Sequence, residues 1–177
     1  MHILALCGSL REFSSNRSLL EAAQLLAPAA MRIEIYADLG RLPQFNPDLE
    51  GNLPSLVAEL HERVGQADGL LISCPEYARG IPGSFKNALD WLVGSTTFPG
   101  KPVALFNASP RASAAQAALR LVLETMSAHL VEDASITLPL LAKGLDAKAI
   151  AADQVIAPPI SAALTAFAEA IEKGAAV

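Results

Sequence analysis

Short apolar runs alternate along this chain with segments in which apolar residues recur every three or four positions. The runs predict five strands, at residues 3–7, 31–36, 69–74, 102–107 and 130–138. The second run alternates apolar and polar residues, so we expect that strand to be more exposed than the first. The last run contains Glu132 and Asp133, where we expect the strand to be bent or broken.

Helical spacing follows each of these strands. It predicts amphipathic helices over residues 19–27, 56–64, 85–92, 115–126 and 160–171, with a shorter helical turn between 139 and 157. Asn52 or Ser55 is the candidate N-cap of the second helix. Leu42 and Phe45 are the apolar anchors of the long loop 38–52, and Trp91 is expected in the core or at an interface.

The alternation of strands with helices predicts a parallel sheet with right-handed crossovers and helices on both faces. Five strands favour the flavodoxin-like three-layer α/β fold, with strand order 2-1-3-4-5. We expect residues 1–177 to form a single domain of this kind. In that order the loops 8–16 and 75–80 follow neighbouring strands and meet at one crevice, where open α/β sheets bind their ligands.

Composition and charge exclude several classes of function. The formal net charge is −5 and the cations are scattered, which argues against a nucleic-acid-binding surface. No apolar run reaches the roughly 18 residues of a membrane span, and the first residues lack a basic signal-peptide region. Cys7 and Cys74 have neither CxxC nor zinc-ligand spacing, so we expect a cytoplasmic protein without a metal site. Both end neighbouring predicted strands, where buried packing is favoured over a redox role.

The loop after the first strand is rich in short hydrogen-bonding side chains. Its donors are Ser9, Arg11, Ser14, Ser15 and Asn16. With the unpaired N–H groups at the start of the next helix, they could form a phosphate site. An equally supported interpretation is that Ser14 to Asn16 only cap the helix while Arg11 is solvated. The loop matches neither GxxxxGK[ST] nor GxGxxG, and without GxSxG it does not predict Ser9 as a nucleophile.

Three motifs together resemble the NADPH-dependent FMN reductase family. The first reads Gly8-Ser-Leu-Arg-x-x-Ser-x-Asn16 and follows the first strand. The second runs from Pro75 to Trp91 and reads PEY-x-x-x-IPG-x-x-KNA-x-DW. Between them, Leu42-Pro-x-Phe-Asn46 resembles a further family segment. The resemblance covers at least residues 2–110 in register, and the order of strands and helices continues it to the end.

The resemblance implies an FMN site built from three loops. The residues that would hold the phosphate are Ser9, Arg11, Ser14, Ser15 and Asn16. Those that would lie along the isoalloxazine ring, largely through backbone N–H groups, are Pro75, Glu76, Tyr77, Ala78, Arg79 and Gly80. The pyrimidine side of the ring would be bordered by Asn107, Ala108, Ser109 and Arg111. Two positions depart from the family: Ala78 stands where many relatives have Asn, and the fourth-strand loop lacks the paired glycines that often follow Ser-Pro.

The resemblance also implies an activity. We expect hydride transfer from NADPH or NADH to flavin N5, then delivery of electrons to a quinone, an azo compound, a metal oxyanion or free flavin. The cofactor carries this chemistry, so no catalytic side chain is predicted. Arg79 and Arg111 are the candidates for binding the 2′-phosphate of NADPH. We also expect a homodimer or homotetramer, with the helix at 85–92 facing a partner subunit.

Two alternatives stay open beside this enzyme. One is a non-enzymatic FMN-binding electron carrier, which the modest net charge disfavours because carriers are usually strongly acidic around the flavin. The other is a regulatory domain that binds a phosphate ligand without redox chemistry.

Overall fold

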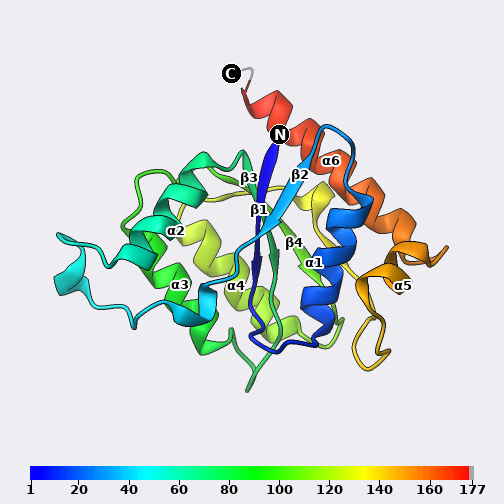
Figure 1. Ribbon diagram of the computed structural model, residues 1–177, viewed down its shortest axis with the longest axis horizontal. Coiled ribbons are helices and arrows are strands. Elements are labelled where there is room, and N and C mark those ends of the chain that lie inside the picture. Colours follow the sequence, from blue (N-terminus) through cyan, green and yellow to red (C-terminus); the bar gives the residue numbers. More distant parts are fainter. Residues whose placement is uncertain (176–177) are drawn as a thin grey trace.

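The computed structural model describes residues 1–175, which form a parallel sheet with helices on both faces (Figure 1). The six strands of the sheet are β1 (His2–Cys7), β2 (Arg32–Ile35), β3 (Gly69–Ser73), β4 (Pro102–Asn107), β5 (His129–Leu130) and β6 (Ile136–Thr137). They pair in the order β2-β1-β3-β4-β5, all parallel, and β6 also pairs with β4. The flavodoxin-like order predicted from the sequence is therefore confirmed.

The predicted fifth strand is interrupted where its two carboxylates lie. β5 ends at Leu130, a 3₁₀ helix spans Glu132–Ala134, and β6 then resumes the pairing with β4. The hydroxyl of Ser135 fills the gap: its Oγ accepts from Leu105 N at 3.1 Å and donates to Val131 O at 3.0 Å. The edge of the sheet stays hydrogen-bonded across the break, because a side chain replaces the missing backbone partner.

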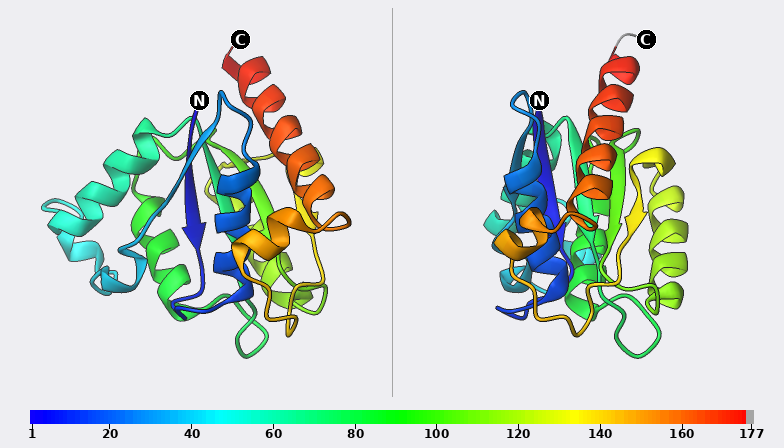
Figure 2. Two further views of the ribbon diagram at one scale, coloured as in Figure 1. Left: turned by 45° about the vertical axis from the view of Figure 1, so that its right-hand side comes forward. Right: turned by 90° about the vertical axis from the view of Figure 1, so that its right-hand side faces the viewer.

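The helices cover the two faces of the sheet. Within the described residues they are α1 (Ser15–Leu26), α2 (Ser55–Gln66), α3 (Gly83–Val93), α4 (Ser113–Thr125), α5 (Ala147–Ala152) and α6 (Ala157–Ala175). Helices α1, α5 and α6 pack on one face, and α2, α3 and α4 pack on the other (Figure 2). α5 is the short helical turn that the sequence predicts between residues 139 and 157.

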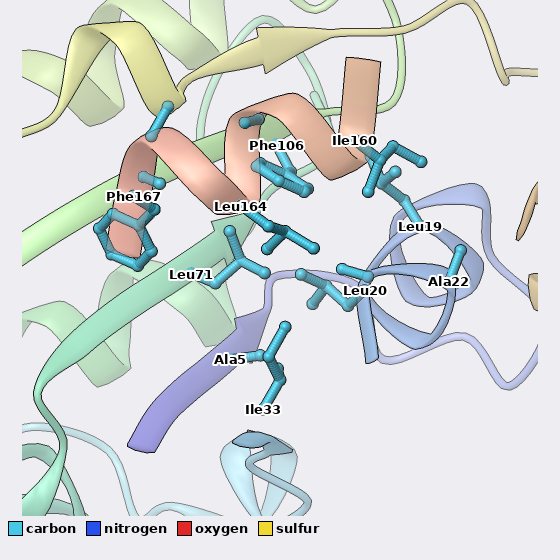
Figure 3. Close-up of a cluster of buried hydrophobic side chains, with 14 of the residues drawn as sticks. Ala5, Leu19, Leu20, Ala22, Ile33, Leu71, Phe106, Ile160, Leu164 and Phe167 are labelled. Carbon is cyan, nitrogen blue, oxygen red and sulfur yellow. The ribbon is translucent and has the colours of Figure 1, made fainter. Parts of the chain in front are cut away.

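One core layer lies between one face of the sheet and the two helices α1 and α6 that cover it (Figure 3). Its labelled members are Ala5, Leu19, Leu20, Ala22, Ile33, Leu71, Phe106, Ile160, Leu164 and Phe167. Burying a large apolar side chain of this kind contributes about 1.5–3 kcal/mol. A Cβ on Gly69 would lie 2.8 Å from Phe167 Cζ, so the absence of a side chain there lets α6 approach β3. This packing fixes the strands whose loops meet at the carboxyl edge.

Neither predicted cap of α2 is used. Pro54 occupies the N-cap position, and its carbonyl accepts from Val57 N and Ala58 N at 2.9 Å each. The helix begins at Ser55, so the Ser55 hydroxyl lies inside the first turn, and Asn52 lies two residues before the N-cap. The cap prediction was wrong because the N-cap residue is a proline, which has no capping side chain.

The long loop 38–52 is anchored to α3. Trp91 is 1% exposed and its Nε1 donates to Pro43 O at 2.8 Å, while its ring meets the Phe45 ring edge-on at 5.0 Å. Asn87 fixes the same segment, because its Nδ2 donates to Pro43 O at 3.0 Å and its Oδ1 accepts from Phe45 N at 2.7 Å. Trp91 is therefore a core residue, the first of the two roles expected for it.

Candidate functional site

A cavity of about 680 Å³ opens at the carboxyl edge of the sheet. The loops that line it follow β1, β3, β4 and β6, and they lie together along the lower side of the molecule in Figure 1. Its volume falls in the range of small-molecule sites, roughly 300–1,000 Å³. The crevice expected between the loops after β1 and β3 is therefore present, with two further walls.

The loop after β1 brings free hydrogen-bond donors to the cavity. Ser14 caps α1, because its backbone is extended and its Oγ accepts from Arg17 N at 3.1 Å. Asn16 Oδ1 accepts from the Ser73 hydroxyl at 2.9 Å, which leaves Asn16 Nδ2 without an acceptor among residues 1–175. The backbone N–H groups of Ser15 and Asn16 also have no acceptor in that part of the chain. The capping interpretation thus holds for Ser14, whereas the first turn of α1 can receive an anion.

Charge in the cavity favours an anionic ligand. Arg11 and Arg111 lie on different walls, and neither guanidinium forms an ion pair within the described residues. Glu76 and Asp146, the two carboxylates of the lining, each accept a hydrogen bond from the N-terminal turn of a helix. Free guanidinium groups beside engaged carboxylates suit the recognition of a phosphate or carboxylate.

The loop after β3 is closed on itself. Tyr77 N donates to Gly80 O at 3.1 Å, and Gly80 N donates to Tyr77 O at 3.0 Å. Between them Ala78 and Arg79 have positive φ angles of 49° and 64°, which is the backbone of a type I′ turn. Residues 75–77 line the cavity, whereas residues 78–80 lie outside its lining.

The contact between this loop and a ring stays a prediction. The N–H groups of Tyr77 and Gly80 are hydrogen-bonded across the turn, so they are not free to face a ligand in this conformation. The side chain of Tyr77 is half exposed, and its Oη lies 3.5 Å from Ser9 Oγ. That contact joins the loops after β1 and β3 at the cavity wall.

The loop after β4 is shaped by the Asn107 side chain. Asn107 Oδ1 accepts from Ser109 N at 3.1 Å, and its Nδ2 donates to Thr137 Oγ1 at 3.3 Å. The predicted residues Asn107, Ala108, Ser109 and Arg111 all line the cavity. Because both polar atoms of Asn107 are engaged within the protein, this side chain holds the loop in shape, and Ser109 and Arg111 remain to meet a ligand.

Sequence reasoning missed a fourth wall, the loop after β6. This loop contributes Leu141, Ala142, Gly144, Leu145 and Asp146 to the lining. Three further lining residues that were not predicted lie on the β1 and β4 sides: Phe13, Ser18 and Ala112. Ser15 Oγ donates to Leu140 O at 3.4 Å and so connects this wall to the loop after β1. The position of this loop in the chain could have predicted its place. It follows the last parallel strand, so it starts at the same carboxyl edge of the sheet as the other three loops. The recognised motifs cover only the first 110 residues and gave no reason to include it.

Cys7 and Cys74 lie at the ends of β1 and β3 but face opposite sides of the sheet. Cys7 packs in the core layer of α1 and α6, and Cys74 packs in the layer of α2 and α3. Burial raises the pKa of the Cys7 thiol and raises the pKa of the Cys74 thiol to about 12. Both thiols are therefore protonated near neutral pH and are poor nucleophiles. Packing is the role that the structure supports.

Known proteins resemble this chain over most of its length. The NADPH-dependent FMN reductase family matches residues 1–141. A 2-hydroxy-1,4-benzoquinone reductase of a Burkholderia species is 38% identical over 112 residues, which cover 62% of this chain and 61% of that protein. A quinone reductase of Escherichia coli (strain K12) is 35% identical over 113 residues, which cover 62% of this chain and 60% of that protein. The chain thus matches about three fifths of the length of these curated relatives.

A solved structure resembles the whole chain. The flavoenzyme NAD(P)H:(acceptor) oxidoreductase FerB from Paracoccus denitrificans aligns with a TM-score of 0.80 and 32% identity, over 98% of both chains. Apart from these comparisons, none of the helices formed by residues 1–175 combines the length and apolar character that crossing a membrane requires.

Proposed function

Because the chain belongs to the NADPH-dependent FMN reductase family, we propose that it is an FMN-dependent oxidoreductase that takes NADPH or NADH as electron donor and reduces a quinone. The family expected from the sequence motifs is confirmed. FMN, when bound, would supply the redox chemistry between the nicotinamide nucleotide and the acceptor. The residues of this chain bind and orient the reactants.

The observation that carries this proposal is the set of free donors on the β1 wall. Arg11, Asn16 Nδ2 and the first N–H groups of α1 face one cavity and have no acceptor or ion-pair partner among residues 1–175. A phosphate needs several such donors and a positive charge, and a helix N-terminus supplies both. These groups would hold the FMN phosphate. The ring would lie between residues 75–77 and residues 108–109, which line the facing walls.

The mouth of the cavity suits a planar apolar acceptor. Phe13, Tyr77 and Leu141 line the cavity and remain 81%, 48% and 52% exposed. Exposed apolar side chains around a cavity favour aromatic ligands, which bury their faces against them. A quinone has this character, and two relatives carry quinone reductase in their names.

Arg111 is the stronger candidate for the 2′-phosphate of NADPH. Arg79 lies outside the cavity lining and 3.9 Å from the Glu76 carboxylate, whereas Arg111 lines the cavity without an ion pair among residues 1–175. A preference for NADPH over NADH is expected to fall when Arg111 is replaced by alanine. The ratio of kcat/KM for the two nucleotides measures it.

The test of the proposed function is reconstitution with FMN. The purified protein is expected to keep a yellow chromophore through gel filtration and to oxidise NADPH or NADH when a quinone is supplied. A protein that stays colourless contradicts FMN binding. A yellow protein that oxidises neither nucleotide would instead support the electron carrier.

The homodimer or homotetramer, the cytoplasmic location and the single FMN-binding domain over residues 1–177 belong to the same proposal. The C-terminal helix α6 packs beside α1 on the same face of the sheet, which supports one domain. Residues 176–177 lie outside the described part of the chain. Light scattering measures the oligomeric state. Limited proteolysis tests the single domain. If the chain forms one domain, no internal cleavage should leave a stable folded fragment.

A further inference from the structure

Glu76 makes a contact that its place in the β3 loop does not predict. Its Oε2 accepts from Ala115 N at 3.0 Å, and Ala115 is the third residue of α4. The N-cap residue of α4 is Ala112, which has no side-chain oxygen to make this bond. The Glu76 side chain is only 14% exposed, so the bond lies largely out of water. A residue from one wall of the cavity therefore caps the helix that begins at another wall.

The electrostatics of this contact are favourable. The first turn of a helix carries partial positive charge and unpaired N–H groups, and a carboxylate placed there compensates both. A second contact joins the same two segments, because Gln116 Nε2 donates to Cys74 O at 3.5 Å. The loop after β3 and the first turn of α4 are thus connected at two points beside the cavity.

We infer that Glu76 is a positioning residue: its carboxylate holds the wall formed by residues 75–77 at a fixed separation from the wall formed by residues 108–112. This inference rests on the proposed function, because the gap between these walls is where the ring of FMN would lie. This role needs no contact between the carboxylate and the reacting atoms. The Glu76 carboxylate acts through α4, because the loop that contains Ser109 and Arg111 leads directly into the first turn of that helix.

The alternative is that Glu76 only stabilises α4, as any cap would. A matched control exists in this chain. The Asp153 carboxylate accepts from Val155 N at 2.8 Å and from Ile156 N at 2.9 Å just before α6, and Asp153 is not part of the cavity lining. Asp153→Ala removes a capping carboxylate away from the cavity, whereas Glu76→Ala removes one that joins two of its walls.

Two measurements separate the alternatives in the full-length protein. The first is the Kd for FMN from flavin fluorescence, with the visible circular dichroism of the FMN-saturated protein as a report on the ring environment. Glu76→Ala is expected to weaken FMN binding on the order of tenfold and to change the spectrum, because a hydrogen bond to a charged group is lost. Glu76→Gln keeps an acceptor oxygen and is expected to lose less. Asp153→Ala is expected to match the wild type in both.

The second measurement needs no flavin. Amide hydrogen exchange in the apoprotein is expected to become faster in both segments, 75–80 and 108–116, in Glu76→Ala. Faster exchange in 108–116 alone would show a simple helix cap and overturn the inference, as would an unchanged Kd and spectrum in a folded Glu76→Ala protein. If Glu76→Ala does not fold, Glu76→Gln is measured in its place. A wild-type protein that binds no FMN refutes the proposed function, and the exchange data then decide the inference on their own.

Discussion

Two walls of the cavity, the loop after β1 and the loop after β3, differ in whether their hydrogen-bond donors are free. After β1, the N–H groups of Ser15 and Asn16 and the side-chain Nδ2 of Asn16 have no acceptor within the described residues. After β3, Tyr77 and Gly80 pair their N–H groups with each other's carbonyls, and Glu76 is bonded to α4. The loop after β1 therefore has donors available to a ligand, whereas the donors of Tyr77 and Gly80 in the loop after β3 are engaged within the protein.

This difference separates two tasks in binding a mononucleotide. A phosphate is recognised by charge and by donors, which can be preformed because α1 lies on a packed core. A planar ring is held mostly by the shape of the surfaces on either side of it. We therefore expect substitutions on the first wall to change phosphate recognition, and substitutions on the second wall to change local stability and the fit of the ring.

The largest effect is expected when the loop after β1 loses its donors. Arg11→Ala with Asn16→Ala removes one guanidinium and one free amide, and hydrogen bonds to charged groups contribute about 1.5–3 kcal/mol each. FMN affinity should fall on the order of a hundredfold, because each factor of ten corresponds to about 1.4 kcal/mol. Riboflavin, which has no phosphate, should bind this variant as it binds the wild type. Fluorescence titration with both ligands measures the change.

Two controls match this double variant. Arg17→Ala removes an arginine of α1 that is paired with Glu21 and lies outside the cavity lining. Ser73→Ala breaks the Ser73–Asn16 hydrogen bond from its other side while leaving the cavity donors in place. Both should keep the preference for FMN over riboflavin. Unchanged FMN affinity in Arg11→Ala with Asn16→Ala would refute the phosphate assignment.

A smaller effect is expected from the cap of α1. Ser14→Ala removes the acceptor of Arg17 N, and losing a serine N-cap typically costs about 1 kcal/mol of stability. Ser113→Ala is the matched change in α4, where the serine is the first helical residue and the cap comes from Glu76. The free energy of unfolding of Ser113→Ala should stay within about 0.5 kcal/mol of the wild-type value. Urea unfolding measures both, and equal losses would show that the two helices are capped alike.

The fold could be predicted from the sequence because its signals are local. The buried runs at residues 3–7, 69–74 and 102–107 have strand length, and each is followed by helical spacing, so the order of a doubly wound sheet follows. The break at Glu132 was visible for the same reason, since two carboxylates do not fit a buried strand. The cap of α2 was not, because Pro54 offered no capping side chain to recognise.

Only part of the candidate site could be predicted. The donors of residues 9–16 stand together in the chain, and one motif contains them. The contact between Glu76 and Ala115 could not be predicted, because it joins positions 39 residues apart. Its donor is a backbone N–H, which does not depend on the type of side chain. The loop of residues 141–146 has no periodicity and lies beyond the motifs, so only the position of the preceding strand could have placed it at the cavity.

The smallest effect is expected at the turn that closes the second wall. Ala78 has a φ of 49°, a conformation that is unfavourable for alanine by about 1 kcal/mol and is tolerated by asparagine. Ala78→Asn should therefore raise the free energy of unfolding by up to about 1 kcal/mol if the closed turn is the resting state. Ala117→Asn, at an exposed position inside α4, should lower it by about 0.5 kcal/mol through helix propensity alone. Urea unfolding of the apoprotein measures both changes. A destabilising effect of Ala78→Asn like that of Ala117→Asn would mean that the turn is open in solution. The N–H groups of Tyr77 and Gly80 would then be free, and the loops after β1 and β3 would not differ as the structure indicates.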